Sequence, residues 1–364
     1  MKFNLAKPVK IATQATGSIS CVEVQKLPEG NFNKVLLLTM NDGKEVIAKL
    51  PNSNAGPQYF TTASEVRNIG AEYIIMEKSQ GVELSKLWDD ILGPDKLGIF
   101  QQLVDFEKAL VSPQFPMHGS PYYAKDLPNV QSNQLIDLGA KRSNAGLDSA
   151  VGPTTNRTFF DDGRNSVDAG HRGPYKEVSK AALWHPDLHG DNIFVDPDQP
   201  TGILSIIDWQ AVNLSPLFLQ VRHPALIEFD GPIPKGLQSI RLPENFDELS
   251  AEEQLGAKKL CAAQSLYKLY DIEMIQQCPE IAAALQFKYS LAGQITGLSD
   301  SVFGDGEPIV QGMLIRLQEE WTTHVGSSLP CSLSFTEEGK KKQKEDEEKW
   351  ASRVVIEDFL DHGV

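Results

Sequence analysis

The sequence predicts an α+β protein with two lobes, a small β-rich lobe over residues 1–76 and a larger, mainly helical lobe over residues 77–364. Three observations predict this fold class. Residues 20–50 hold three apolar segments separated by turn residues, which is typical of a β-meander. From residue 84 onward, apolar side chains recur at helical spacings of three and four. Within the second lobe, residues 183–209 contain two short apolar segments with polar residues at both outer ends.

Length and composition restrict the functions that are compatible with the chain. With 364 residues, of which 41% are hydrophobic, the chain is long enough to bury a substantial core. The net charge of −15, from 34 basic and 49 acidic residues, argues against general binding to nucleic acids or anionic membranes. No apolar segment approaches 18 residues, so no transmembrane helix is expected. The four cysteines show no Cys-x-x-Cys spacing, which favours a reducing compartment without structural zinc.

The strands of the first lobe are expected at residues 20–27, 35–40 and 45–50. In the first of them, Val22 and Val24 alternate with polar residues and would share one face. The second and third are joined by Asn-Asp-Gly-Lys, and Asp-Gly is among the strongest short-range hairpin signals. Local pattern and turn chemistry therefore agree on an antiparallel meander.

The segment that follows the meander is unusually short. A helix is expected to begin near Thr62, with Glu65 three residues later as in a capping box. An apolar strand is expected at 72–78. Seven residues separate Glu65 from Tyr73, whereas a mean helix has about 11 residues and a mean strand about 5. The first lobe is therefore expected to lack part of a helix and one strand.

The second lobe begins with a predicted helical face and continues into an irregular region. The face is formed by Leu84, Leu87 and Trp88, and Gly93-Pro94 ends it. Residues 112–180 are rich in Gly, Pro, Ser and Asn. Long loop regions inside compact domains are usually functional or disordered, so we expect this one near a substrate entrance.

Further helices are predicted along the rest of the chain. Asp95 is the expected N-cap of a helix whose buried face has spacings of four, three and four, namely Ile99, Leu103, Phe106 and Leu110. Two more helices are expected at 251–275 and 308–321. The densely charged segment 337–349 has mixed signs, which is typical of a solvated helix face.

The residues that carry chemistry lie around a predicted hairpin in the second lobe. His185-x-Asp187 is followed by Asn192, by a strand, by a turn, and by a second strand that ends at Asp208. The two ends of a hairpin are adjacent, so Asn192 and Asp208 are expected side by side. Their oxygens suit Mg²⁺, which takes a few protein oxygens together with phosphate and water. Asp187 is placed to accept a proton from a substrate hydroxyl.

Two other interpretations of this segment remain open at this point. On a strand, His185, Asp187 and His189 would share one face, as in a zinc hydrolase site. The same side chains can also be ordinary polar loop residues. Upstream, Lys49 ends a Val-Ile-Ala-Lys segment, and in isolation this pattern favours a solvated lysine on an edge strand over a functional one.

Together, these motifs resemble the aminoglycoside phosphotransferase and choline kinase branch of the protein-kinase-like superfamily. The resemblance is carried by His-x-Asp-x-His-x-x-Asn (185–192) and Ile-Asp-Trp (207–209). Within that branch the chain is similar over nearly its whole length to fungal phosphotransferases of the altered inheritance of mitochondria protein 9 type. The similar segments include 27–33, 72–78 and 152–156. The resemblance implies a two-lobe kinase-like fold.

The resemblance also implies roles for individual residues. Lys49 would pair with the α- and β-phosphates of ATP, and Glu65 would be its ion-pair partner, a role that stands beside its capping role. His185 would hold the catalytic loop through hydrogen bonds, whereas His189 receives no role. The remaining nucleotide contacts would come from a phosphate-covering turn and from the strand that joins the lobes: Gly30, Asn31, Phe32, Met76, Glu77 and Lys78.

The expected activity is transfer of the γ-phosphoryl group of ATP to a hydroxyl of a small molecule, with Mg²⁺ and ATP as cofactors. Asp187 would be the base or substrate-orienting residue, and Asn192 and Asp208 would bind the metal. The alternative is a catalytically weak, nucleotide-binding protein that acts through a partner, because the shortened segment 66–72 would weaken ATP binding. The resemblance implies a mitochondrial location, while the absence of a clear targeting segment leaves a cytoplasmic one open. The sequence assigns neither the phosphoryl acceptor nor an oligomeric state.

Overall fold

The computed structural model describes residues 5–28, 33–51, 73–127, 129–136, 149–153, 180–209, 212–234, 239–298, 306–324 and 330–362. The chain groups into two compact units, Met1–Cys278 and Pro279–Val364. The lobe boundary expected near residue 76 lies inside the first unit and stays a prediction.

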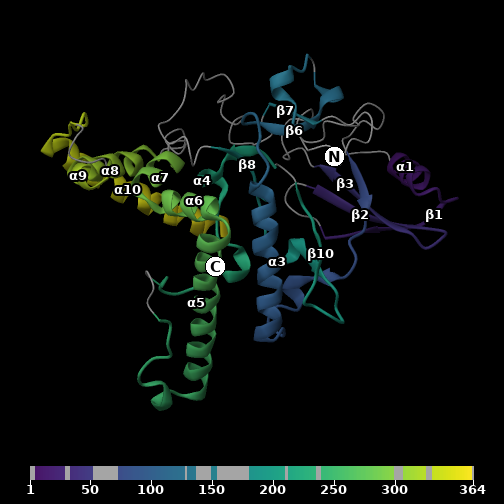
Figure 1. Ribbon diagram of the computed structural model, residues 1–364, viewed down its shortest axis with the longest axis horizontal. Coiled ribbons are helices and arrows are strands. Elements are labelled where there is room, and N and C mark those ends of the chain that lie inside the picture. The colour runs from purple at the N-terminus through teal and green to yellow at the C-terminus, as the bar shows by residue number, and fades with distance from the viewer. Residues whose placement is uncertain are drawn as a thin grey trace. The chain divides into compact units, whose positions relative to one another are not determined.

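The first unit begins with a helix and a four-stranded antiparallel sheet (Figure 1). The sheet has the order β1-β2-β3-β4 and is formed by β1 (Cys21–Lys26), β2 (Asn33–Met40), β3 (Glu45–Pro51) and β4 (Ile74–Glu77). This confirms the predicted meander and the apolar strand after it. At the β2–β3 turn, Gly43 has a φ of +81°, a conformation that glycine adopts without a Cβ clash.

Helix α1 (Ala6–Thr16) packs against this sheet and was not predicted from the sequence. It ends at Gly17, which has a φ of +68° and whose N–H donates to the Gln14 carbonyl. The shared core contains Ala12 together with Leu36, Leu38, Met40, Val46, Ala48, Leu50 and Tyr73. Val22 and Val24 on β1 remain 64% and 39% exposed, so their alternation reflects strand preference more than burial.

A second small sheet holds the predicted hairpin of the C-terminal lobe. Its order is β10-β9-β5, with β5 (Val82–Glu83), β9 (Ile193–Val195) and β10 (Ile203–Ile206) all antiparallel to their neighbours. Gly81, at a φ of +83°, precedes β5, and a Cβ there would come within 2.2 Å of the Val195 carbonyl oxygen. Glycine is therefore what allows β5 to approach β9.

Two sequence predictions in this region are corrected by the structure. The face expected from Leu84 to Trp88 is a single 3₁₀ turn, η1 (Leu84–Lys86), although Leu84, Leu87 and Trp88 do enter the core. Asp95 is not an N-cap, because α3 (Gly93–Val111) begins two residues earlier with Leu92 at the cap position. Pro94 suits the first helical turn, where no N–H is needed.

The core under the hairpin combines α3 with β9. Its buried members are Leu84, Ile91, Ile99, Leu103, Leu188, Ile193 and Val195. The Gln102 side chain joins α3 to the hairpin, since its Oε1 accepts from the Ile203 N–H at 3.0 Å and its Nε2 donates to the Thr201 carbonyl at 2.6 Å. Helix α3 thus fixes the hairpin from one side, as the predicted Ile99–Leu110 face required.

Other strands and turns complete the sheet-bearing part of this unit. Strand β6 (Ser120–Tyr123) pairs with β7 (Ser149–Gly152), and β8 (Ala181–Leu183) pairs with β11 (Leu214–Pro216). The short helical elements are η2 (Ala124–Asp126), η3 (Ser132–Gln134), η7 (Gly190–Asn192), α4 (Leu217–Gln220), η8 (Ala225–Ile227) and η9 (Phe246–Glu248).

Helix α5 (Ala251–Gln277) ends the first unit and packs on α3. Ser250 caps it, with Glu253 closing a capping box. The Tyr270 hydroxyl donates to Glu107 Oε2 at 2.8 Å, and the Phe100 and Tyr270 rings meet edge to face at 6.1 Å. Tyr267 and Tyr270 are buried on this helix, with 8% and 0% exposed.

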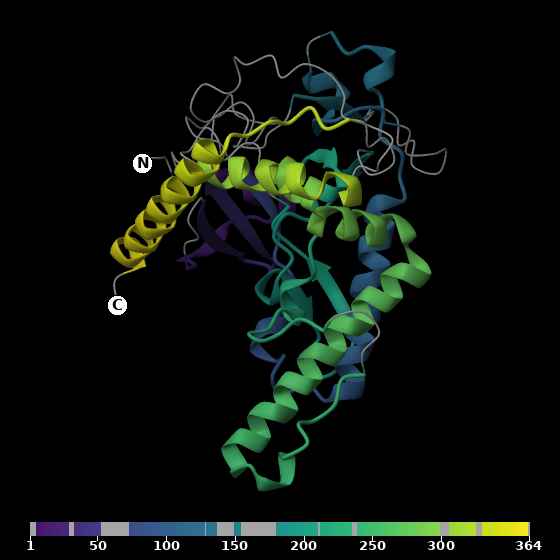
Figure 2. The ribbon, with the colours of Figure 1, turned by 90° about the vertical axis from the view of Figure 1, so that its left-hand side faces the viewer.

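The second unit is helical (Figure 2). It consists of α6 (Pro279–Tyr289), α7 (Leu291–Gly297), α8 (Glu307–Glu319), α9 (Trp321–His324) and α10 (Glu337–His362). The helix predicted at 308–321 ends earlier, at Glu319, so that Trp321 begins α9. Gln343 on α10 is buried and donates to the Pro308 carbonyl at 3.0 Å. In the described part of the chain, no helix is both long and apolar enough to cross a membrane.

Candidate active site

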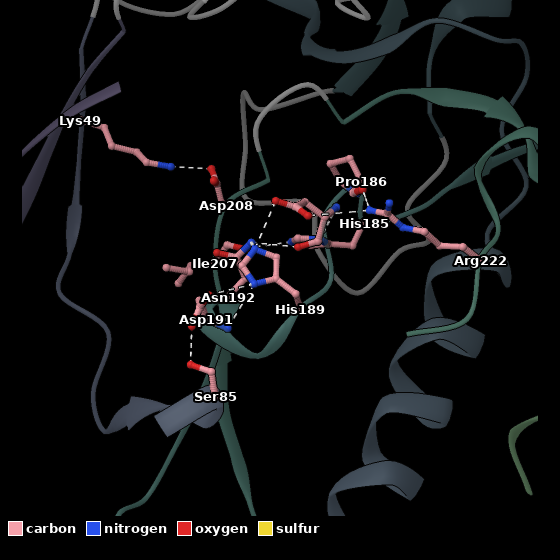
Figure 3. Close-up of polar contacts among 11 residues, drawn as sticks. Lys49, Ser85, His185, Pro186, His189, Asp191, Asn192, Ile207, Asp208 and Arg222 are labelled. Carbon is pink, nitrogen blue, oxygen red and sulfur yellow. Dashed lines mark hydrogen bonds and ion pairs between the residues drawn. The ribbon is translucent and has the colours of Figure 1, made fainter. Parts of the chain in front are cut away.

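The loop between β8 and β9 is held by a buried histidine. His185 is 1% exposed. Its Nδ1 accepts a hydrogen bond from the Asp187 N–H at 3.2 Å, and its Nε2 lies 2.9 Å from the Ile207 carbonyl oxygen, to which it donates in the matching tautomer (Figure 3). Burial lowers the pKa of His185 despite the hydrogen bond to Ile207, so the ring is neutral. This is the bracing role that the sequence suggested.

The side chain of Asp187, whose N–H donates to His185, is 62% exposed. Its Oδ2 lies 3.3 Å from His189 Nε2, and its Oδ1 lies 3.9 Å from an Arg222 nitrogen. An exposed carboxylate between two nitrogen donors is accessible to a substrate hydroxyl and is able to accept its proton.

Asn192 closes the loop from the other end. Its Nδ2 donates to the Asp187 carbonyl at 2.8 Å and lies 3.1 Å from His189 Nε2. The residue is buried, yet none of the described residues donates a hydrogen bond to its Oδ1. That carbonyl oxygen is therefore available as a ligand for a cation.

Asp208 lies at the same end of the hairpin as Asn192. The β9–β10 register pairs Ile206 with Ile193, and the Ile207 N–H donates to the Asn192 carbonyl at 2.9 Å. The adjacency of positions 192 and 208 predicted from the hairpin is thus present in the backbone. Asp208 has a φ of +64°, a left-handed conformation that few residues other than glycine adopt and that Asp tolerates.

Lys49 reaches this aspartate from the N-terminal sheet. Its Nζ lies 2.5 Å from Asp208 Oδ1, and its side chain is 17% exposed (Figure 3). Strand β3 is an inner strand between β2 and β4, so Lys49 is not the solvated edge-strand lysine that the sequence also allowed. The contact joins residues 159 positions apart and brings the lysine expected at the phosphates to the aspartate expected at the metal.

The other expected nucleotide contacts are placed only in part. Met76 lies on β4 opposite Ile47, and Glu77 lies opposite Val46. Lys78 follows the strand and forms an ion pair with Glu45 at 2.7 Å. The remaining expected contacts lie outside the described residues: Gly30, Asn31, Phe32 and Glu65.

The structure adds residues that the sequence did not single out. The Ser85 hydroxyl donates to the Asp191 carboxylate, which ties η1 to the loop of residues 185–192 (Figure 3). A Cβ on Gly190 would come within 3.0 Å of the Ser85 backbone nitrogen. The His-Gly-Asp sequence at 189–191 was the available signal for Gly190, whereas no local pattern indicated Ser85 or Arg222.

The ligand set at the hairpin suits a hard cation. Asn192 offers an amide oxygen and Asp208 a carboxylate, which are the oxygen ligands that Mg²⁺ takes alongside water and phosphate. In the described ranges, no three His, Cys, Asp or Glu side chains converge to hold a metal ion, so the zinc hydrolase interpretation finds no supporting geometry there. All four cysteines are free thiols.

Comparison with curated proteins shows fungal relatives. The chain is 28% identical over 343 residues to a subtelomeric hrmA-associated cluster protein of Aspergillus fumigatus, covering 66% of this chain and 67% of that protein. It is 19% identical over 460 residues to altered inheritance of mitochondria protein 9 of Yarrowia lipolytica, covering 98% of this chain and 77% of that protein. The second aligned span exceeds the 364 residues of this chain, so the Yarrowia protein contains residues without a counterpart here. No protein-family model matches the chain.

Solved structures similar to the chain are aminoglycoside phosphotransferases. A ternary complex of APH(4)-Ia with ADP and hygromycin B is 14% identical and covers 88% of this chain and 99% of that chain, with a TM-score of 0.39. A GDP complex of aminoglycoside 2'-phosphotransferase-IIIa is 13% identical and covers 88% and 99%, with a TM-score of 0.35. The chain thus resembles both groups that its sequence motifs indicated.

Proposed function

We propose that this chain transfers the γ-phosphoryl group of Mg²⁺-bound ATP to a hydroxyl of a small molecule. One observation carries the proposal. The loop and hairpin of residues 185–208 place an exposed carboxylate, an amide oxygen without a donor among the described residues, and a left-handed aspartate next to Lys49 from the N-terminal sheet. Phosphoryl transfer requires little covalent chemistry from a protein, so these charges and their positions would be the main catalytic contribution.

Each side chain has a distinct part in this proposal. Asp187 orients the acceptor hydroxyl and takes its proton. Asn192 and Asp208 would hold Mg²⁺, which supplies charge neutralisation at the phosphates when it is bound. Lys49 would exchange its contact with Asp208 for one with the phosphates, because its ammonium is a compact charge on a flexible stem. His185 keeps the loop fixed.

A second candidate function is nucleotide binding without efficient transfer. It is favoured by the N-terminal sheet, in which β4 pairs with β3 and, within the described ranges, with no other strand. If the protein bound ATP only weakly, it would transfer phosphate poorly and would act by binding a partner instead. The two functions differ in one product, because only the transferase converts ATP to ADP with a phosphorylated acceptor.

The test is a transfer assay on the whole chain. ATP, Mg²⁺ and pools of small alcohols, sugars and amino alcohols are incubated with the protein, and phosphorylated products are detected by mass spectrometry. We expect a product that depends on Mg²⁺ and that is absent with the Asp187→Asn variant. Nucleotide binding without any product across the pools supports the second function, and the absence of nucleotide binding contradicts both.

A mitochondrial location is also proposed. The Yarrowia relative, which aligns with 98% of this chain, has a name that describes it as mitochondrial. Imaging of the full-length natural protein with a C-terminal fluorescent tag against a mitochondrial marker tests the location, and a diffuse cytoplasmic signal contradicts it.

A further inference from the structure

Arg222 contacts the catalytic loop from a separate part of the chain. It follows α4, and one of its guanidinium nitrogens donates to the Pro186 carbonyl (Figure 3). The same nitrogen lies 3.9 Å from Asp187 Oδ1. Among the described residues these are the polar partners of its side chain, which is 46% exposed. The guanidinium therefore meets both the backbone and the carboxylate of the loop.

The neighbouring residue anchors this arginine to α5. His223 is 4% exposed. Its ring stacks on Tyr267 at 4.0 Å with an interplanar angle of 14°, and its Nε2 lies 3.0 Å from Asp271 Oδ1. Lys268 lies 3.2 Å from the other oxygen of Asp271. Because α5 is a 27-residue capped helix, it provides a rigid support for the backbone at 222–223.

Asp271 is charged in this arrangement. Burial raises the pKa of its carboxyl, but the hydrogen bonds from His223 and Lys268 outweigh burial and leave that pKa below its ordinary value. A carboxylate that accepts from both neighbours holds the imidazole in one orientation. The position of Arg222 is therefore set by a charged contact one residue away.

On the side away from Arg222, the Asp187 carboxylate faces His189. His189 Nε2 lies 3.3 Å from Oδ2, while Arg222 lies nearest Oδ1. The carboxylate thus has a nitrogen near each oxygen, one from its own loop and one from the segment anchored on α5. Without Arg222, its orientation would depend on the loop alone.

We propose that Arg222 is a positioning residue that orders the catalytic loop by fixing the Pro186 carbonyl and orienting the Asp187 carboxylate. The kinetic part rests on the proposed phosphoryl transfer, whereas the ordering of the loop does not. Arginine suits the task because its guanidinium always carries its charge, and one of its nitrogens lies near both the Pro186 carbonyl and the Asp187 carboxylate.

The test compares Arg222→Met with Arg316→Met, a surface arginine of α8 that pairs with Glu320. Hydrogen exchange is followed for the peptide covering 184–192. ATP turnover is measured with an acceptor found in the transfer assay or with water as the acceptor. We expect faster exchange of that peptide in Arg222→Met alone. We also expect its kcat to fall by about tenfold or more, with the KM for ATP within about twofold of the natural protein.

Added guanidinium ion at low millimolar concentration should restore part of the lost kcat in Arg222→Met, which a purely structural defect would not allow. Arg222→Lys keeps the charge, so it serves if the methionine variant does not fold, and it should show an intermediate kcat with an unchanged melting temperature. The proposal would be overturned if either variant kept the hydrogen exchange rate of peptide 184–192 and the kcat of the natural protein. It would also be overturned if the loss of kcat matched a fall in melting temperature and added guanidinium restored none of it. Absence of turnover in the natural protein argues against the proposed function, while the exchange comparison still decides the role of Arg222.

Discussion

At the scale of single residues, the proposed site separates the acceptor side from the nucleotide side. Asp187 is exposed and faces outward from the loop, whereas Lys49 and Asp208 contact each other on the side of the N-terminal sheet. In the proposed reaction, Asp187 acts on the acceptor, and Lys49 and Asp208 act on the nucleotide. Variants at the two places should therefore have different consequences.

For Asp187→Asn, we expect the transfer rate to fall by about 10²–10⁴, because the amide cannot accept the hydroxyl proton. Nucleotide affinity should stay within about twofold, because the backbone N–H of position 187 still donates to His185. Steady-state kinetics and a nucleotide titration measure the two quantities. Equal losses in both would show that Asp187 acts on the nucleotide instead.

Among the residues that sequence analysis identified, Asn192 and Asp208 were predicted to be adjacent from local structure, whereas Lys49, 159 positions from Asp208, was identified through the family resemblance. One short hairpin brings the backbones of Asn192 and Asp208 together, since the N–H of the residue before Asp208 donates to the Asn192 carbonyl. Arg222 and Ser85 were missed because their contacts with the catalytic loop connect segments 36 and 106 residues apart. Such contacts depend on how α4 and η1 pack, which the periodicity of a single sequence does not reveal.

At the scale of elements, strands were predicted better than helix starts. The meander followed from alternation together with an Asp-Gly turn, and all of its strands are present. Asp95 was wrongly predicted as a cap because proline fits the first helical turn as well as it ends a preceding segment. Helix α1 was missed even though Gly17 supplies a left-handed stop signal at its end.

The close approach of η1 to the catalytic loop depends on Gly190. For Gly190→Ala, a Cβ 3.0 Å from the Ser85 nitrogen is too close for an ordinary contact, so the Ser85 segment must shift by a few tenths of an ångström. We expect a loss of about 1–3 kcal/mol in the free energy of unfolding, as for overpacking, and a lower transfer rate. Gly202→Ala in the turn of the same hairpin is the control, because nothing lies within 4 Å of its Cβ. Equal urea midpoints for the two variants would contradict the packing argument.

The contact between α3 and α5 makes stability depend on pH through Glu107. Burial raises the pKa of this carboxyl from 4.5 to about 8, against the smaller lowering by the Tyr270 hydroxyl. Below about pH 4.5 both folded and unfolded states hold the proton. Between about pH 4.5 and 8 the folded state binds it more tightly, so stability from this group is lost as pH rises, by up to about 1.4 kcal/mol per pH unit.

Glu107→Gln should remove this dependence, because the amide does not titrate and its oxygen still accepts from Tyr270. Urea unfolding at pH 5, 6, 7 and 8 measures it, with Glu252→Gln on the exposed side of α5 as the control. His185 has a lowered pKa and contributes a change of the opposite sign as pH falls through about 6.5. It is present in both variants, so their difference isolates Glu107. Identical pH profiles would contradict a buried, protonated Glu107.

At the scale of the whole molecule, the N-terminal sheet is the part expected to limit function. Strand β4 pairs only with β3 among the described residues, and Ile74 on it is 41% exposed. The Yarrowia relative aligns over more residues than this chain contains. The seven residues between Glu65 and Tyr73 predict a shortened segment before β4. That segment itself lies outside the described residues.

We therefore expect uneven hydrogen exchange across the chain. Peptides from β1 to β4 should exchange faster than peptides from α3 and α5, because a sheet with an unpaired edge opens more readily than packed, capped helices. Insertion of a helix and strand after Val66, taken from the Yarrowia relative, should slow exchange in the sheet and tighten ATP binding. Uniform protection, together with tight ATP binding by the natural chain, would show that the shorter segment has no functional cost.

The most direct test of the account is whether nucleotide binding requires a metal held by Asp208. Calorimetric titration of ATP is carried out with Mg²⁺ and with EDTA, on the natural chain and on Asp208→Asn. We expect Mg²⁺ to raise the ATP affinity of the natural chain by about tenfold or more, and this gain to disappear in the variant. Equal ATP affinity of the natural chain in Mg²⁺ and in EDTA would contradict a metal-dependent phosphotransferase site at Asn192 and Asp208.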